Sequence, residues 1–112
     1  MVHINTKKID ILVVNTYGPN RDDPNFYANL NEKIAKLGIL NLVLAGDWNL
    51  VLDPTLDYCN YKRQNNVKAP EKKMEEITTD DCLVDIWGEL NPQIQRFTWR
   101  RTKRLQQSRL DF

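Results

Sequence analysis

The chain has 112 residues, the length of one small domain. Its 16 lysines and arginines nearly balance its 15 acids, so the net charge of +1 does not by itself indicate a nucleic-acid partner. No apolar run is long enough for a membrane span or a secretory signal, so we expect no membrane partner and a nuclear or cytoplasmic protein. Cys59 and Cys82 lack metal-ligand spacing and are expected to be inert, reduced thiols.

The first half of the chain predicts a strand, a helix and a second strand. Residues 9–15 form a nearly unbroken run of leucine and β-branched side chains, which predicts a strand covered on both faces. Asp23 before Pro24 predicts a helix start, and apolar residues recur at helical spacing as far as Gly38. Residues 41–46 predict the next strand. This order favours a crossover unit in which both strands end at the same edge of a sheet.

The second half predicts a loop, two helical segments and a hairpin. Residues 53–68 are polar and irregular, which is typical of a surface loop. A charged helix is expected to start at Pro70, and a short apolar segment at 83–87 follows it. Two strand-like pieces then enclose a basic stretch that has no acid, which predicts a hairpin with a basic tip. Its residues are Arg100, Arg101, Lys103, Arg104 and Arg109.

Polar residues follow the ends of the two strands predicted in the first half. Asp47 and Asn49 come after one strand, and Tyr17 and Asn20 come after the other. Ligands of α/β folds bind beyond the carboxyl ends of strands, so all four are candidate site residues. Simpler interpretations stay open: Asp47 and Asn49 form an ordinary Asx turn, the ring of Tyr17 packs under its turn, and Asn20 caps a loop.

Four segments occur in a fixed order: Asn-Thr-Tyr-Gly-Pro-Asn at 15–20, Gly-Asp-Trp-Asn at 46–49, Thr-Trp at 98–99 and Ser-Arg-Leu-Asp-Phe at 108–112. Together they resemble the endonuclease/exonuclease/phosphatase family, and most of all the apurinic-type endonuclease domain of non-LTR, LINE-like retrotransposons. The resemblance implies an α/β fold, a partial two-sheet α/β sandwich of the DNase I-like type. Residues 1–112 would form a single partial domain, from the middle and later part of the family domain.

The resemblance also implies Mg²⁺-dependent hydrolysis of a phosphodiester. Asp47 would orient or deprotonate the attacking water, and Asn49 would hold the phosphate or the water. Tyr17 would contact the scissile phosphate, and Asn20 would support the same strand end. Asp111 matches an aspartate that orients a catalytic histidine. DNA is the implied partner, and the positions matching its binding surface are Thr98, Ser108, Arg100 and Arg101.

Two family features have no match in this sequence. In the family, the glutamate that binds the metal precedes the strand that matches residues 9–15. Every glutamate here follows that strand, so no metal ligand is assigned. The family's later Ser-Asp-His strand has no counterpart, and the single histidine, His3, is expected to be exposed. We therefore expect an endonuclease fragment that is inactive alone. A non-catalytic nucleic-acid-binding remnant is the alternative, and a metal-dependent phosphatase is a third reading. Uncovered sheet faces would favour self-association.

Overall fold

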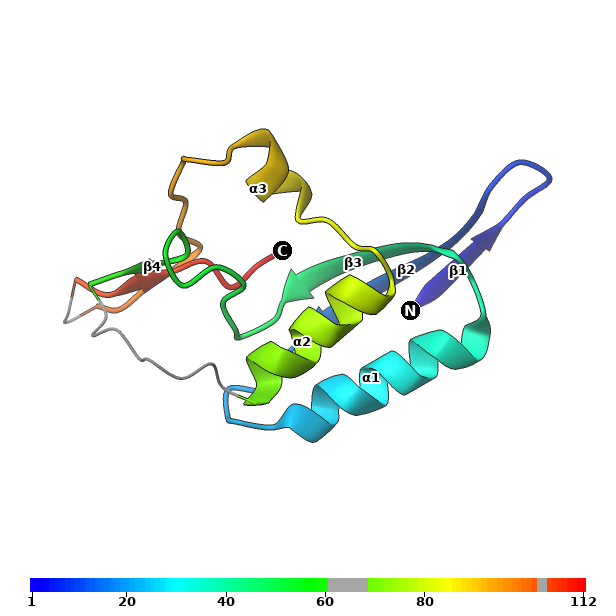
Figure 1. The fold of residues 1–112 in the computed structure, drawn as a ribbon, viewed down its shortest axis with the longest axis horizontal. Coiled ribbons are helices and arrows are strands. Elements are labelled where there is room, and N and C mark those ends of the chain that lie inside the picture. The colour runs from blue at the N-terminus through cyan, green and yellow to red at the C-terminus, as the bar shows by residue number, and fades with distance from the viewer. Residues whose placement is uncertain (61–68, 103–104) are drawn as a thin grey trace.

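The computed structural model describes residues 1–60, 69–102 and 105–112, and these form a mixed α/β arrangement of two small sheets and three helices (Figure 1). The first sheet has the order β1 (Val2–Asn5), β2 (Asp10–Tyr17), β3 (Asn41–Asp47). The second has the order β4 (Tyr58–Cys59), β6 (Gln107–Ser108), β5 (Trp99–Arg100). The helices are α1 (Pro24–Leu37), α2 (Ala69–Asp80) and α3 (Ile86–Leu90).

The predicted crossover unit is confirmed, because β2 and β3 pair in parallel and α1 connects them. Leu12 and Val14 of β2 point toward the helices and are almost fully buried. The prediction that this strand is covered on both faces is wrong. Both α1 and α2 lie on one side of the sheet (Figure 1), and Val43 on the other side is 47% exposed. A run of apolar residues does not reveal how many faces are covered.

Helix α1 begins and ends where the sequence predicts. The Asp23 carboxylate accepts a hydrogen bond from the Phe26 N–H at 3.3 Å, and Pro24 occupies the first helical turn. Gly38 ends the helix with φ of 62° and donates its N–H to the Ala35 carbonyl at 3.1 Å. The apolar stripe of the helix can therefore pack on β2 and β3 in a fixed orientation.

The core lies between the first sheet and these two helices. Tyr27 from α1 and Trp48, just after β3, are buried and stacked with ring centroids 6.5 Å apart. The Tyr27 hydroxyl donates to the Trp48 carbonyl at 2.5 Å. Burial, with smaller effects of Asp47 and Asp23, raises the pKa of Tyr27 to about 12. Met74 and Ile77 of α2 complete this core.

The predicted hairpin is also present, because β5 and β6 pair antiparallel with Trp99 opposite Ser108. Lys103 and Arg104 of its basic tip, and residues 61–68 of the predicted loop, lie outside the described residues. The first part of that loop differs from the prediction: Asp57 is buried, and β4 follows it and pairs with β6. No helix in the described part of the chain is both long and apolar enough to cross a bilayer.

Candidate functional site

The ends of β2 and β3 lie side by side, with Tyr17 opposite Asp47 in the parallel register. The Gly18 N–H donates to the Asp47 carbonyl at 2.7 Å and joins the two chains just beyond the sheet. Gly46 has φ of 137°, and a Cβ there would lie 2.0 Å from the Thr16 carbonyl oxygen. A side chain at position 46 would therefore separate the strand ends that carry the candidate residues.

Asp47 and Asn49 form a tight polar turn after β3. The Asp47 Oδ1 atom accepts from the Asn49 N–H at 3.0 Å, which is an Asx turn. The Asn49 amide donates to the Gly18 carbonyl at 2.6 Å, and this bond ties the turn to the end of β2. Asn49 has a positive φ of 49°, which asparagine tolerates better than most residues. The turn thus fixes one carboxylate oxygen of Asp47 and leaves Oδ2 without a hydrogen-bond partner among the described residues.

Tyr17 is available to solvent, because 67% of it is exposed. This exposure argues against the interpretation in which its ring packs under the following turn. The Asn20 amide lies 3.5 Å from the Tyr17 hydroxyl, at the limit of hydrogen-bond distance, and both residues are on the surface. The two polar groups therefore lie together on the surface, and both can reach a bound molecule.

The segment that carries Asp111 runs antiparallel to the end of β3. Gly46 and Phe112 exchange two backbone hydrogen bonds, of 3.0 and 3.1 Å, and the Trp48 N–H donates to the Leu110 carbonyl at 2.8 Å. Asp47 and Asp111 are the pair directly opposite each other between these bonds. Opposite residues of an antiparallel pair project from the same side of the sheet, so the two carboxylates share one face.

Tyr17 projects from that same face, because it is the parallel neighbour of Asp47. Three predicted site residues from three separate segments therefore gather at one end of one sheet face: Tyr17, Asp47 and Asp111. We call this group the strand-end cluster. Within the described residues, no group of three or more histidine, cysteine, aspartate or glutamate side chains could hold a metal ion. The cluster offers two carboxylates and a phenol.

The hairpin residues have mixed accessibility. Arg100 and Arg101 are exposed, and the Arg101 guanidinium donates to the Gln106 side chain at 3.3 Å. The Thr98 hydroxyl accepts from the Leu110 N–H at 3.0 Å and so stabilises the segment that leads to Asp111. Ser108 is only 2% exposed and offers little surface to a duplex. The two arginines are therefore the predicted DNA-facing residues with the greatest freedom to reach a phosphate.

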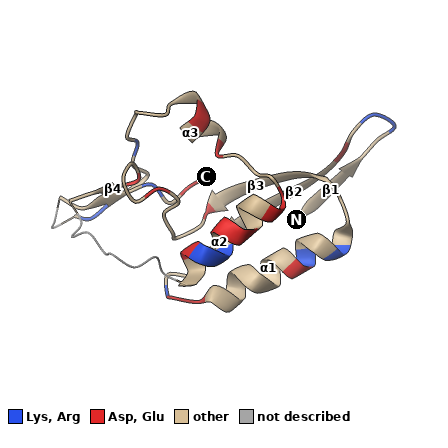
Figure 2. Cartoon of the chain, in the orientation of Figure 1, with Lys and Arg blue, Asp and Glu red and all other residues tan. Residues whose placement is uncertain are grey.

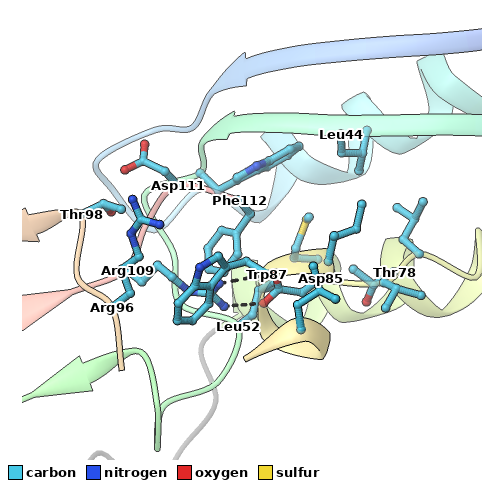
Figure 3. Close-up of a pocket in the computed structure, with 16 residues that line it drawn as sticks. Leu44, Leu52, Thr78, Asp85, Trp87, Arg96, Thr98, Arg109, Asp111 and Phe112 are labelled. Carbon is cyan, nitrogen blue, oxygen red and sulfur yellow. Dashed lines mark hydrogen bonds and ion pairs between the residues drawn. The ribbon is translucent and has the colours of Figure 1, made fainter. Parts of the chain in front are cut away.

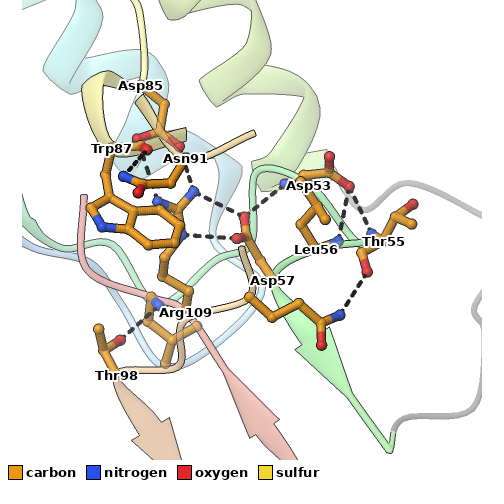
Figure 4. Close-up of polar contacts among 11 residues, drawn as sticks. Asp53, Thr55, Leu56, Asp57, Asp85, Trp87, Asn91, Thr98 and Arg109 are labelled. Carbon is orange, nitrogen blue, oxygen red and sulfur yellow. Dashed lines mark hydrogen bonds and ion pairs between the residues drawn. The ribbon is translucent and has the colours of Figure 1, made fainter. Parts of the chain in front are cut away.

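Arg109 is not part of the basic tip, because its side chain is buried between two acids (Figure 4). Its Nε donates to Asp57 Oδ1 at 2.8 Å, and its Nη2 donates to Asp85 Oδ2. The guanidinium lies 5.1 Å from the centroid of the Trp87 ring and 4.4 Å from that of Phe112. Burial alone would lower the pKa of Arg109, but the bonds to Asp85 and Asp57 outweigh it and raise that pKa.

The bonds of Arg109 to Asp57 and Asp85 connect the segment that leads to Asp111 with two other parts of the chain. The Arg109 N–H also donates to the Asp57 carbonyl at 3.0 Å, so β4, α3 and the segment leading to Asp111 meet at one side chain. Composition and spacing do not predict the buried contact between Arg109 and Asp57, because Arg109 stands in a basic stretch and Asp57 in a polar one. The match to Ser-Arg-Leu-Asp-Phe singled out the segment without indicating what its arginine does.

A cavity of about 540 Å³ lies between α2, α3 and the open edge of β3 (Figure 3). Most of its walls are apolar, with Leu44, Leu52 and Phe112 among them. Arg96, Thr98 and Asp111 line it as well, and Figure 3 shows Thr98 and Asp111 near each other. The strand-end cluster thus borders this largely apolar cavity at Asp111.

Charge is distributed unevenly around the cluster (Figure 2). On the helix side of the molecule, α2 and the loop after it expose Glu75, Glu76, Asp80 and Asp81. Arg100 and Arg101 belong to the hairpin of the second sheet. A search against protein-family models finds no match to this chain, and a search of curated proteins finds none either.

Proposed function

We propose that this chain is part of a Mg²⁺-dependent phosphodiesterase, a DNA-nicking endonuclease domain of the retrotransposon type, and that it is inactive alone. The observation that carries the proposal is the strand-end cluster: Tyr17, Asp47 and Asp111 come from three segments and share one end of one sheet face. These are the residues that the four-segment resemblance assigns to the chemistry, and the register brings them together independently of that resemblance.

Each member of the cluster has a role that its contacts allow. Asp47 has one oxygen fixed by the Asn49 N–H, so its free oxygen can accept a proton from a water beside a phosphate. The exposed Tyr17 hydroxyl can donate to a phosphate oxygen, where negative charge accumulates in the transition state. Asp111 is exposed and can orient a basic group that approaches from solvent.

The donor set is compatible with Mg²⁺ only if the substrate helps to hold the ion. Mg²⁺ keeps several waters and is often bound through one or two carboxylates together with substrate phosphates. Asp47 and Asp111 are two such carboxylates on one face. When bound, the ion would supply positive charge to the phosphate oxygens.

The expected lack of activity rests on residues that have no match here. No glutamate corresponds to the family's metal ligand, and the only histidine is His3 in β1. His3 pairs with Leu12, whereas the cluster begins at Tyr17 at the far end of β2, and its ring lies 2.6 Å from an Asp10 oxygen. Each missing catalytic group would lower the rate by roughly 10²-fold or more.

Nicking of supercoiled plasmid by the purified chain tests this proposal. We expect no nicking with Mg²⁺ from protein whose circular dichroism shows that it is folded. Nicking that disappears with EDTA and in Asp47→Ala would contradict the inactivity but support the phosphodiesterase assignment. Nicking that survives Asp47→Ala would contradict the proposed site, because another group would then activate the water.

A non-catalytic nucleic-acid-binding function is the second candidate, and the exposed pair Arg100 and Arg101 favours it. The Arg100 side chain has no hydrogen-bond or ion-pair partner among the described residues, so its guanidinium is free to contact phosphate. Fluorescence anisotropy with a labelled duplex would measure such binding across a range of salt concentrations. Binding that weakens steeply with salt, without cleavage, would favour this candidate.

A further inference from the structure

Arg96 stands at the edge of the cavity that the strand-end cluster borders. Among the described residues that line this cavity, the arginines are Arg96 and Arg109. The Arg109 guanidinium is already held by Asp57 and Asp85. Arg96, by contrast, is exposed, and its side chain makes no hydrogen bond or ion pair within the described part of the chain. Its positive charge is therefore available to a bound molecule.

The backbone on both sides of Arg96 is bonded to other parts of the chain. The residue lies in the segment between α3 and β5. The Gln95 side-chain amide donates to the Thr55 carbonyl at 3.4 Å, and the Thr98 N–H donates to the Ser108 carbonyl at 3.1 Å. These bonds limit the positions that the backbone of Arg96 can take. Less conformational entropy is then lost when its side chain binds a ligand.

The Arg96 side chain extends toward Asp111 and Thr98, as Figure 3 shows. The Thr98 hydroxyl accepts from the Leu110 N–H at 3.0 Å, which leaves its own hydrogen as a donor. A guanidinium carries five N–H donors, more than one carboxylate can accept. Arg96 can therefore donate to Asp111 and to a second anion at the same time, and Thr98 adds a further donor beside it.

A phosphate that approaches the strand-end cluster needs such a cation. Asp47 and Asp111 project from the same face, and both carboxylates repel a phosphate group. We infer that Arg96 binds a phosphate of the DNA strand beside the strand-end cluster and offsets the charge of Asp111. The planar guanidinium matches two phosphate oxygens in a bidentate contact. This inference rests on the proposed phosphodiesterase function, because it takes the DNA strand to cross the cluster.

An NMR titration of the complete chain with a short self-complementary DNA duplex, without Mg²⁺, tests the contact. We expect the Arg96 Nε–Hε signal and the backbone amide signals of Tyr17 and Asp47 to shift together. Arg96→Gln should weaken binding about tenfold and lower the slope of log affinity against log salt by about 0.9, the value for one phosphate contact. Lys33→Gln on α1 removes the same charge from another exposed position and should change the affinity by less than about twofold.

A second variant repeats the test if Arg96→Gln does not fold by circular dichroism. Arg96→Lys keeps the positive charge but loses the bidentate geometry, so it should bind the duplex about threefold more weakly than the wild type. Affinity equal to that of the wild type in both variants would overturn the contact.

The titration separates this inference from the proposed function. Shifts of Tyr17 and Asp47 without a shift of Arg96 would overturn the Arg96 contact and leave the proposed function intact. A shift of Arg96 alone, with weaker binding by Arg96→Gln, would support the contact and contradict the proposed site at the strand ends. If none of the three signals moves at any duplex concentration, both the contact and the proposed site are wrong.

Discussion

The Arg109 Nε and the Asp57 Oδ1 atoms lie 2.8 Å apart although both side chains are almost completely buried. The pair joins two segments that are distant in the sequence, and Asp85 and the Trp87 ring complete the surroundings of the guanidinium. Removal of one partner from a buried ion pair leaves a charge without compensation, which makes Arg109 the residue whose loss should affect the second sheet most.

Arg109→Ala should lower the free energy of unfolding by about 3 to 5 kcal/mol, because Asp57 and Asp85 would both lose their partner. Urea denaturation followed by circular dichroism measures this change. Arg101→Ala is the control, since that side chain is exposed and its loss should change stability by less than about 0.5 kcal/mol. Equal effects of the two substitutions would show that the buried network adds no stability.

Stability should fall at high pH because of Tyr27. Its folded-state pKa of about 12 lies above the unfolded value of 10.0, so the folded state holds the proton more tightly. The resulting stability is complete below pH 10 and is lost as pH rises from 10 toward 12, by at most about 3 kcal/mol. The loss of stability should appear as a lower urea midpoint at pH 11.5 than at pH 9.

Tyr27→Phe separates this effect from the titration of lysines. The variant loses the bond to the Trp48 carbonyl, which should cost about 1 kcal/mol at neutral pH. Between pH 10 and 12, the free energy of unfolding of this variant should fall by less than that of the wild type. A pH dependence identical in both proteins would mean that Tyr27 does not titrate as we expect.

Gly46→Ala should destabilise the strand ends by about 2 to 4 kcal/mol, because a Cβ would lie 2.0 Å from the Thr16 carbonyl oxygen in a backbone with φ of 137°. Gly38→Ala is the matched control. Gly38 also has positive φ, but a Cβ there meets nothing within 4 Å, so the cost should be about 1 kcal/mol. Thermal unfolding of both variants distinguishes backbone strain from the steric clash.

Replacement of Arg100 and Arg101 together by glutamine should weaken duplex binding and flatten its dependence on salt. Each phosphate contact contributes about 0.9 to the slope of log affinity against log salt, so the slope should change by about 2. Lys33→Gln on helix α1 is the control for charge, since Lys33 is exposed away from the hairpin. An unchanged slope in the double variant would exclude these arginines as phosphate contacts.

The sequence predicts strands β2 and β3 and helix α1 well because those signals are local. The cap at Asp23, the end at Gly38 and the apolar runs of β2 and β3 depend on neighbouring residues alone. The parallel crossover then follows from connection rules, and with it the adjacency of Tyr17 and Asp47.

The second sheet could not be predicted to the same extent, because its determinants are pairings between distant residues. Asp57 appears in a polar stretch and Arg109 in a basic one, and only their mutual contact explains why both are buried. The bridge between Asp47 and Asp111 depends in turn on where that network holds the segment after β6. The sequence does not predict strand β1, because Val2–Asn5 is a short run of only four residues, and in the structure all four are exposed.

Trp48 lies in the chain between Asp47 and Asn49 and is completely buried. Its indole N–H has no hydrogen-bond acceptor among the described residues. An indole in dry, apolar surroundings fluoresces at shorter wavelength than one in water. The 40% exposed Trp99 should emit at longer wavelength. Trp48 fluorescence therefore reports on the surroundings of the strand-end cluster. Water that reaches the buried indole next to Asp47 should shift the Trp48 emission to longer wavelength.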